Sequence, residues 1–376
     1  MPLGKLGSKN MIKNSTKLNK QFWKNKKVFV TGHTGFKGTW LTLILLNCGA
    51  IVSGLSLKPN ENENENILFK SLKVQNRINH YEGDIRDIEN LENCIATEKP
   101  EVIFHLAAQP LVRKSYVEPI LTWEVNTIGS INVMEAAKNK LENCILVMIT
   151  TDKVYENNEW VFGYREIDAL GGYDPYSSSK AAAELAINTW RLCFSKLENS
   201  FLKISSARSG NVIGGGDWAR DRIIPDAMLA LSMKKVLKIR NKLSTRPWQH
   251  VLEPLYGYLL LAQKMDENDQ SSKFNSAFNF GPYNNSNKTV EELLEEIFKT
   301  WNGEWVELNG GTKMHEANKL YLSIDKSINL LGWEPRWDFQ KTVKNTVNWY
   351  KSYYNNPKNT MDYCLRDINE FFEDKK

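Results

Sequence analysis

The stretch VFVTGHTGFKG, residues 28–38, decides the fold class of this 376-residue chain. Its apolar start predicts a β-strand, and the amphipathic stretch 38–47 predicts a helix. Three glycines, Gly32, Gly35 and Gly38, lie between the two. Glycine permits a tight turn and a close backbone approach, so a dinucleotide diphosphate can rest on the positive end of the helix. An ordinary strand-to-helix turn is the alternative, but the combined strand, turn and helix favour a cofactor site.

The same alternation of short apolar runs and amphipathic stretches continues along the chain. Strands are predicted at 51–55, 102–106, 145–150 and 203–207, and helices at 123–138, 177–189, 290–299 and 339–350. Alternating strands and helices form right-handed βαβ units around a parallel sheet. The predicted fold is therefore α/β: a Rossmann-type doubly wound parallel sheet with a smaller α/β C-terminal substrate-binding domain.

Composition divides the chain into four parts. Residues 1–21 are rich in Lys and Asn and are expected to form a basic, disordered tail. Residues 22–207 are expected to form the dinucleotide-binding domain with the catalytic residues. Residues 208–355 are expected to bind substrate, with some segments returning to the Rossmann sheet, and 356–376 to form a C-terminal helical tail. Most of the late tryptophans are expected in the core because of their large apolar area: Trp301, Trp305, Trp333, Trp337 and Trp349.

Charge, hydropathy and cysteine usage exclude several classes of protein. The chain has 49 basic and 44 acidic residues, but residues 1–27 alone hold eight lysines and no acid. The remainder is slightly acidic, which argues against a nucleic-acid partner. The longest apolar run, 40–57, is interrupted and too short to span a bilayer, so we expect a soluble, cytoplasmic protein without a membrane partner. Five dispersed cysteines without CxxC spacing predict buried, reduced thiols and no metal site.

Tyr176 and Lys180 are the first candidates for catalysis. They lie four residues apart in a predicted helix, so their side chains share one face. A tyrosine with a pKa of about 10 is a poor base at neutral pH, and each unit of lowering requires about 1.4 kcal/mol. The Lys180 ammonium, together with a cationic nicotinamide, is expected to supply this lowering.

The segment TTDKVY, residues 150–155, follows a predicted strand. The carboxyl ends of strands in a doubly wound sheet open onto the ligand crevice. Thr151, Asp152 and Lys153 are therefore expected to form a hydrogen-bonding and proton-transfer cluster. The alternative is that Asp152 caps a turn and Lys153 is solvated.

Two segments bear on the adenosine end of a dinucleotide. The end of the second strand, LSLK at 55–58, lacks the acid that commonly binds the ribose in NAD-binding proteins, and its lysine leaves NADP as a minor alternative. The segment GDIRD at 83–87 follows the third strand-like run, where this fold class commonly contacts adenine. Capping of the next helix by Asp84 and Asp87 explains the same spacing equally well.

These residues together resemble the extended short-chain dehydrogenase/reductase family over about residues 22–350. Within that family the chain is similar to nucleotide-sugar 4,6-dehydratases that act on CDP-glucose. Six stretches carry the resemblance: TGHTGFKG at 31–38, HLAAQPLVR at 105–113, TTDKVY at 150–155, GGYDPY at 171–176, GNVIGGGDW at 210–218 and RPWQHVLEP at 246–254.

The resemblance implies a redox-neutral dehydration with NAD as cofactor. NAD would accept a hydride from C4 of the glucosyl unit while Tyr176 takes the hydroxyl proton; water would leave across C5–C6, and the hydride would return to C6. Thr151 would hydrogen-bond the C4 oxygen, Asp152 would protonate the departing hydroxyl, and Lys180 would also bind the nicotinamide ribose. Relatives that act on dTDP-glucose carry Glu where this chain has Lys153, which would act as the C5 base or stabilise the enolate.

The resemblance also implies the binding residues and a homodimer. The expected cofactor contacts are Gly32, Thr34, Gly35, Phe36, Lys37, Gly38, Asp84, Ile85, Leu106, Ala107, Ala108, Asn126, Tyr176 and Lys180. The expected substrate contacts are Gln109, Arg113, Asn211, Arg222, Arg246 and Asn279. Of these, Arg246 and Arg222 suit a diphosphate because a guanidinium donates two parallel hydrogen bonds. Family members pair through helices corresponding to residues 123–138 and 177–189.

Three alternatives remain at this point. A 4-epimerase shares the glycine turn and the Tyr/Lys pair but needs no acid–base pair for elimination, so Asp152 and Lys153 favour a dehydratase. A dehydratase for another nucleotide sugar shares the whole mechanism. A non-catalytic NAD-binding regulator on the same fold is disfavoured by the intact Thr151, Tyr176 and Lys180.

Overall fold

A parallel sheet forms the centre of the molecule in the computed structural model, which describes residues 18–59, 66–197, 200–219, 222–267, 273–308 and 319–373. Within these residues the strand order is β12-β7-β5-β4-β1-β2-β3, and all six neighbouring pairs are parallel. The strands are β1 (Lys27–Thr31), β2 (Ile51–Ser56), β3 (Asn79–Glu82), β4 (Val102–His105), β5 (Asn143–Ile149), β7 (Ser200–Ser209) and β12 (Ala277–Phe280). The short β6 (Lys196–Leu197) adds an antiparallel pair to β7.

This order places the topological switch between β1 and β4, where the chain reverses its direction across the sheet. Ligands of doubly wound sheets bind outside the carboxyl ends of the strands at such a switch. The predicted fold class is therefore confirmed, and it assigns the site to the residues that follow β1, β4 and β5.

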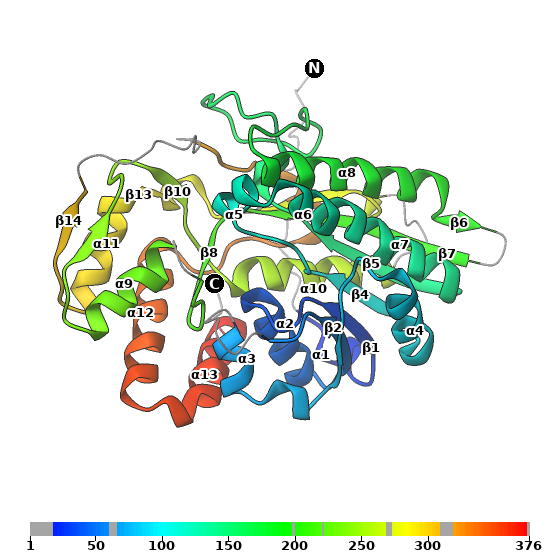
Figure 1. Cartoon of the computed structure of the whole chain (residues 1–376), viewed down its shortest axis with the longest axis horizontal. Helices are drawn as coiled ribbons and strands as arrows, with labels where there is room; N and C mark the ends of the chain where they lie inside the picture. The colour runs from blue at the N-terminus through cyan, green and yellow to red at the C-terminus, as the bar shows by residue number, and fades with distance from the viewer. Residues whose placement is uncertain are drawn as a thin grey trace, which may run out of the picture.

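Helices cover both faces of the sheet (Figure 1). Helices α4 (Ile88–Glu98), α7 (Gly129–Lys140) and α8 (Pro175–Cys193) pack on one face, and α2 (Phe36–Asn47) and α10 (Leu252–Glu267) on the other. Side chains along β1 alternate between the two cores: Phe29 packs on the first face, and Val28 and Val30 on the second. Strands buried on both faces are typical of parallel sheets.

Helix α2 differs from its prediction. The sequence predicts an amphipathic helix, but α2 buries every residue from Gly38 to Leu45. It packs beside α10 on the same face of the sheet, and the C-terminal region packs against the same core, so little of the helix is left to water. A helix that is apolar all round is typical of such a fully enclosed position.

The predicted helix 123–138 is divided in three. Helix α6 (Pro119–Trp123) continues into one π-helical turn, η3 (Glu124–Ile128), and then into α7. Single π turns inside α-helices often occur at functional sites. Here the turn brings Asn126 under the loop that follows β4.

The later part of the chain builds a smaller region beside the carboxyl ends of the strands, on the left of Figure 1. Its helices are α9 (Ile223–Ser232), α11 (Val290–Thr300), α12 (Phe339–Asn355) and α13 (Thr360–Glu373). Its strands form three pairs: β8 (Val212–Ile213) with β11 (Gln249–His250), β9 (Leu237–Ile239) with β14 (Trp305–Glu307), and β10 (Thr245–Pro247) with β13 (Asn287–Thr289). The segment 252–280 returns to the sheet as α10 and β12.

Shorter helical turns complete the structure. They are α1 (Lys20–Trp23), α3 (Ile67–Ser71), η2 (Val74–Asn76), α5 (Val112–Val117), η4 (Asp152–Val154), η6 (Asn284–Ser286), η7 (Ser327–Leu331) and η8 (Pro357–Asn359). Most of the expected basic tail, residues 1–17, lies outside the described residues. Residues 18–21 are described, and Asn19 already caps α1.

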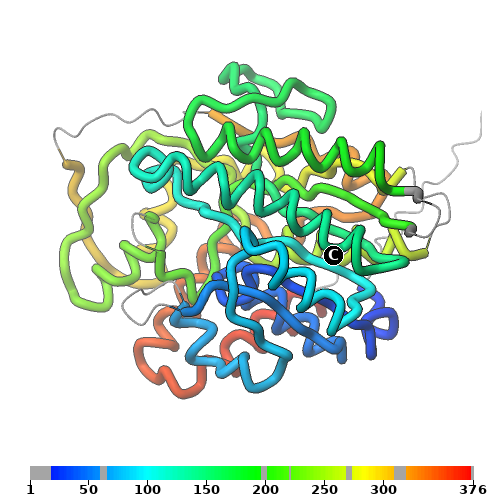
Figure 2. The backbone as a smooth tube through the Cα atoms, turned by 45° about the vertical axis from the view of Figure 1, so that its right-hand side comes forward, coloured from blue at the N-terminus to red at the C-terminus, as the bar shows by residue number. Residues whose placement is uncertain are grey.

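The two ends of the described chain lie side by side in the core. Figures 1 and 2 both show the C-terminal helices against the N-terminal α2–α3 segment. Arg77 after η2 contacts Met361 of α13, and the Trp40 indole of α2 donates to the Gly215 carbonyl. Phe371 of α13 is fully buried, so the expected C-terminal helical tail is a packed part of the fold.

The tryptophans and cysteines largely follow their predictions. Trp333, Trp337 and Trp349 are buried, whereas Trp301 and Trp305 are half-buried and pack against the core. All five cysteines are free thiols and four are buried, but Cys193 at the end of α8 is exposed, contrary to expectation. No helix in the described part of the chain is long and apolar enough to cross a membrane.

Candidate active site

The glycine turn after β1 forms a backbone cradle at the switch point. Gly32 has a φ of 74°, and a Cβ there would lie 2.7 Å from the Ala107 nitrogen of the loop after β4. A Cβ on Gly38 would lie 2.1 Å from the Gly32 carbonyl oxygen. Gly35 is the N-cap of the twelve-residue α2 and makes no side-chain hydrogen bond to it. The first backbone amides of α2 therefore point at the turn and are not occupied by a capping side chain. The cradle fits the diphosphate of a dinucleotide, because free amides and the helix dipole both favour an anion.

The adenosine end of the cradle differs from the common pattern. Ser56, at the end of β2 where an acid is often found, exchanges a hydrogen bond with Thr34 of the glycine turn at 2.6 Å. Lys58, which raised the NADP alternative, is exposed. A hydroxyl pair therefore lines this end of the cradle.

The segment 83–87 divides between the two predicted roles. Asp87 N-caps α4 by accepting from the Asn90 amide, as the capping alternative predicted. Asp84 does not cap the helix; it accepts two hydrogen bonds from the Arg86 guanidinium, which in turn pairs with Glu124. Burial raises the pKa of Asp84, but the bonds from Arg86 outweigh it and lower the pKa overall. The Ile85 side chain is buried, and its carbonyl already accepts from Asn132.

The loop after β4 closes the cradle from the other side. Leu106, Ala107 and Ala108 are half-buried there, and the Ala107 amide lies 3.3 Å from the Thr31 hydroxyl. Asn126 was expected to contact the cofactor, but its amide is buried and bonded to the Gln109 backbone and to Ser179. It therefore holds this loop against α8.

Three predicted catalytic groups meet beyond the cradle. The Thr151 hydroxyl donates to the Asp152 carboxylate at 3.0 Å and also hydrogen-bonds the Tyr176 hydroxyl. A Cβ on Gly210, the residue after β7, would lie 2.8 Å from Asp152 Oδ2, so only glycine leaves room for this carboxylate. All three side chains are more than nine-tenths buried. A hydroxyl, a carboxyl and a phenol in one buried cluster can exchange protons with a ligand in the crevice.

Burial dominates the titration of the catalytic pair on α8. It raises the pKa of Tyr176 to about 12, with the Thr151 hydrogen bond opposing it. The expected lowering of the Tyr176 pKa by Lys180 is thus not produced by the protein's own groups. Burial also lowers the pKa of Lys180 to about 8, and the negative charge of Glu184 opposes this. The Lys180 amine makes a single long bond, 3.4 Å to the Ile149 carbonyl.

Lys37 was expected among the cofactor contacts, and the structure places its amine in the catalytic cluster. Its Nζ donates to the Ser209 hydroxyl at 2.8 Å, and Ser209 bonds the Tyr258 hydroxyl at 2.8 Å. Burial, together with the positive charges of Arg222 and Lys180, lowers the pKa of Lys37 to about 7 against the opposing charge of Asp152. Sequence reasoning missed Ser209 and Tyr258, because nothing local marks a serine in a strand or a tyrosine in an apolar helix.

Lys153 lies at the edge of this cluster. It is half-buried on η4, and its backbone amide lies 3.3 Å from the Thr151 hydroxyl, which caps the turn. Of the expected substrate arginines, Arg222 occupies the N-cap position of α9 without a side-chain cap, pairs with Asp217 at 2.8 Å and is in electrostatic contact with Tyr176. Arg246 of β10 is half-buried and precedes Pro247, which packs beside Gly210.

Two expected substrate contacts are used inside the protein. Gln109 donates to the Leu111 carbonyl and the Thr122 hydroxyl and accepts from the Leu111 amide. Asn279 is fully buried, donates to two backbone carbonyls and accepts from the Tyr155 hydroxyl. Both side chains therefore have structural roles in this fold: each donates both of its amide hydrogens inside the protein, which leaves one lone pair of the side-chain oxygen for a ligand. Arg113 on α5 and Asn211 after Gly210 are exposed.

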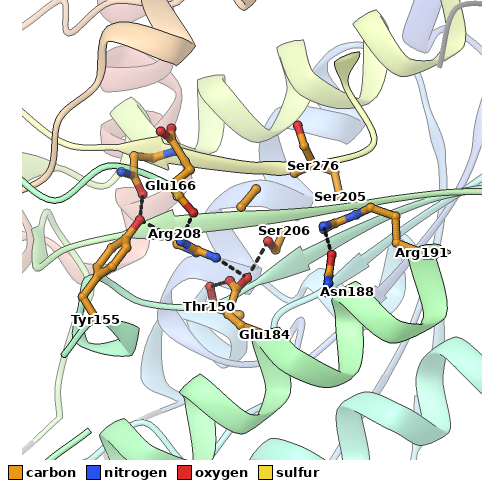
Figure 3. A network of polar contacts seen from close by, with 12 residues as sticks. Thr150, Tyr155, Glu166, Glu184, Asn188, Arg191, Ser205, Ser206, Arg208 and Ser276 are labelled. Atoms are coloured by element: carbon orange, nitrogen blue, oxygen red, sulfur yellow. Dashed lines mark hydrogen bonds and ion pairs between the residues drawn. The ribbon is translucent and has the colours of Figure 1, made fainter. Parts of the chain in front are cut away.

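A buried polar network behind the catalytic helix was also missed. Glu184 of α8 pairs with Arg208 of β7 at 2.8 Å, and Arg208 continues to the Tyr155 hydroxyl (Figure 3). Glu184 follows Lys180 by one helical turn, but its partner is distant in sequence, and no local pattern identifies the pair.

Comparisons with known proteins agree with this geometry. A family profile described as GDP-mannose 4,6 dehydratase matches residues 29–346. CDP-glucose 4,6-dehydratase from Salmonella typhimurium (strain LT2) is 45% identical over 341 residues, 89% of this chain and 93% of the relative. UDP-glucose 4-epimerase from Lacticaseibacillus casei is 25% identical over 342 residues, 87% of this chain and 97% of the relative. DesIV, a dTDP-glucose 4,6-dehydratase from Streptomyces venezuelae solved with NAD bound, has a TM-score of 0.74 at 20% identity and covers 88% of this chain and 99% of that chain.

The solved structure shares the fold, and the family profile's match includes the glycine turn, the TTDKVY segment and the Tyr/Lys helix. The family profile covers the central sheet from the third residue of β1 onward and most of the smaller region. The chain therefore belongs to the GDP-mannose 4,6-dehydratase type of the extended short-chain dehydrogenase/reductase family.

Proposed function

We propose that this protein is an NAD-dependent hydro-lyase that converts CDP-D-glucose to CDP-4-dehydro-6-deoxy-D-glucose. The observation that carries the proposal is the buried Thr151–Asp152–Tyr176 cluster beside a diphosphate cradle. An epimerase needs the phenol and the cradle but no carboxyl to expel water, so Asp152 supports elimination. The choice of CDP rests on the 45% identity to the Salmonella enzyme.

NAD bound at the cradle would accept a hydride from C4 of the sugar and later return it to C6. Tyr176 would take the C4 hydroxyl proton once a cationic nicotinamide lowers the pKa of its phenol, which burial in the protein alone raises to about 12. Thr151, bonded to both Tyr176 and Asp152, would hold the C4 oxygen. Oxidation at C4 makes the C5 proton acidic. Asp152, buried beside Gly210, would then donate a proton to the hydroxyl that leaves C6.

Lys153 acts at C5 in this scheme, either as the base or as a cation beside the enolate. Its half-buried position next to Asp152 supports contact with the same side of the sugar. Lys153→Met should lower kcat about 100-fold or more without unfolding the protein, since a positioned acid or base contributes about 10²–10⁴-fold. Turnover by the variant within a factor of about two of the wild type would remove Lys153 from the mechanism.

The first test of the function is a mass measurement. The protein is incubated with NAD and, in separate reactions, with CDP-glucose, dTDP-glucose and GDP-mannose. Loss of water from CDP-glucose alone, without build-up of NADH, is the expected result. Loss of water from another sugar nucleotide would support the dehydration but assign the enzyme a different nucleotide base specificity. An unchanged mass with altered sugar stereochemistry would establish a 4-epimerase, the second candidate, which the Lacticaseibacillus relative represents.

We further propose that the enzyme is a cytoplasmic homodimer that supplies deoxysugar biosynthesis, for example of a surface polysaccharide such as O-antigen.

Exposed apolar residues on the helices that pair in the family support the dimer: Ile120, Trp123, Ile128, Leu185 and Leu192. Burial of such side chains stabilises an interface by the hydrophobic effect. Light scattering should give twice the chain mass of 43.3 kDa, and Trp123→Glu should give the single mass.

A further inference from the structure

The catalytic groups lie on two separate elements. Thr151 and Asp152 follow β5, whereas Tyr176 and Lys180 lie on α8. Direct links between the two are few: the Thr151–Tyr176 hydrogen bond and the 3.4 Å contact of Lys180 with the Ile149 carbonyl. Transfer of a proton depends steeply on geometry, and a displacement of about 1 Å lowers a rate roughly 100-fold. A further bond that fixes the end of β5 against α8 would therefore bear directly on the rate.

The Glu184 carboxylate makes that connection (Figure 3). Its Oε1 accepts from the Thr150 hydroxyl at 2.5 Å, and Thr150 directly precedes Thr151. Its Oε2 accepts from Ser206 and from Arg208 of β7, both at 2.8 Å. The Glu184 and Arg208 side chains are 2% and 4% exposed, so water competes with none of these bonds.

Arg208 extends the same network to the segment after Asp152. Its guanidinium donates to the Tyr155 hydroxyl at 2.8 Å and to the Glu166 carbonyl at 3.2 Å. Tyr155 lies three residues after Asp152, and its ring stacks on Tyr164 with centroids 5.1 Å apart. Both flanks of the Thr151–Asp152 pair are thereby tied to one buried ion pair.

We propose that Glu184 is a positioning residue of this active site, which holds the strand end bearing Thr151 and Asp152 against the helix bearing Tyr176 and Lys180 and places a negative charge one helical turn from Lys180. The inference rests on the proposed function of the site. Burial alone would favour the neutral amine of Lys180, and Glu184 is the acid that opposes this. The other titratable groups in electrostatic contact with Lys180, Lys37 of α2 and His105 of β4, are cationic when charged and cannot replace it.

The positional part of the proposal is tested by two matched variants. Thr150→Val removes the bond from Glu184 to the catalytic strand end, and Ser206→Ala removes a bond to the same carboxylate from β7. Both leave the ion pair in place, so both should fold with a similar, small loss of Tm. Thr150→Val should lower kcat roughly 10- to 100-fold with little change in KM, whereas Ser206→Ala should keep the wild-type kcat. Thr150→Ser, which retains the hydroxyl, should restore most of the rate. Equal kcat values for Thr150→Val and Ser206→Ala would overturn the positional role.

The charge is tested by titrating Lys180 directly, with ¹³C-labelled lysine followed by NMR and the signal assigned with Lys180→Met. Removal of the Glu184 charge should lower the pKa of Lys180, so the alkaline limb of kcat should move to lower pH. The charge is removed in Glu184→Gln. The double variant Glu184→Gln/Arg208→Gln, in which Arg208 is not left as an unpaired buried charge, is used if the single variant does not fold. An unchanged Lys180 pKa in the folded variant would refute the electrostatic role. This readout needs no substrate, so it remains decisive even if the wild-type protein dehydrates none of the sugars tested.

Discussion

Two sets of buried groups at the active site are treated in opposite ways: the Glu184–Arg208 ion pair, named the rear pair, and the amines of Lys180 and Lys37 with Tyr176, named the front cluster. In the rear pair, Glu184 and Arg208 lie 2.8 Å apart, and the carboxylate accepts three hydrogen bonds. In the front cluster, the amines of Lys180 and Lys37 each donate to one acceptor among the described residues, and their pKa values are lowered to about 8 and about 7. A buried charge without full pairing destabilises the fold. The front cluster therefore destabilises the fold, but its groups can act on a ligand. The rear pair holds the catalytic groups in position.

The largest expected effect lies in the front cluster. Tyr176→Phe removes the hydroxyl that exchanges the C4 proton but keeps the ring that fills its buried position. We expect kcat to fall about 10³-fold or more, with an unchanged Tm and retained nucleotide binding. Steady-state kinetics and calorimetric titration of CDP measure the two quantities. A variant with near-normal turnover would show that the phenol has no catalytic role.

The next prediction compares the effect of a substitution in each of the two regions on the free energy of unfolding. Arg208→Met leaves the Glu184 charge buried without its partner and should lower the free energy of unfolding by about 3–5 kcal/mol. Lys180→Met removes a poorly paired buried amine and should leave the free energy of unfolding unchanged or raise it. Urea denaturation of both variants measures the difference. A comparable loss in the two would contradict the division into a paired and an underpaired region.

The pH dependence of stability sharpens the comparison. Because the pKa of Lys37 is lowered on folding from 10.5 to about 7, the unfolded chain binds more protons between these values. Stability contributed by this group therefore rises with pH across that window. Lys37→Met should raise Tm relative to the wild type most at pH about 6, and the gain should shrink as the pH approaches about 10. A pH-independent difference in Tm would show that Lys37 is not held as an underpaired amine.

The smallest expected effect lies outside both regions. Arg246 borders the site through Pro247 and is proposed to bind the substrate diphosphate. Arg246→Ala should raise KM roughly 10-fold, the equivalent of one charge-assisted hydrogen bond, and leave kcat and Tm nearly unchanged. Initial-rate measurements with CDP-glucose check it, and an unaltered KM would remove Arg246 from the substrate site.

Local patterns in the sequence determined the framework of this protein. The glycine turn, the alternation of strands and helices, and the four-residue spacing of Tyr176 and Lys180 each act over a single turn or helix. Backbone sterics and helical periodicity decide such features, so they could be predicted without tertiary contacts. The place of Thr151 and Asp152 at a strand end followed from the same reasoning.

Only the tertiary structure decided how the polar side chains are used. The Lys37 amine hydrogen-bonds Ser209, which lies 172 residues away in the sequence, instead of facing the cradle. The Asn279 amide donates to two carbonyls that lie more than 40 residues away in the sequence. Glu184 pairs with Arg208 of β7, and the Gln109 side chain hydrogen-bonds the backbone of its own loop. The desolvation of a polar group and the partner that compensates it depend on packing between segments far apart in the chain, so no local pattern carries that information.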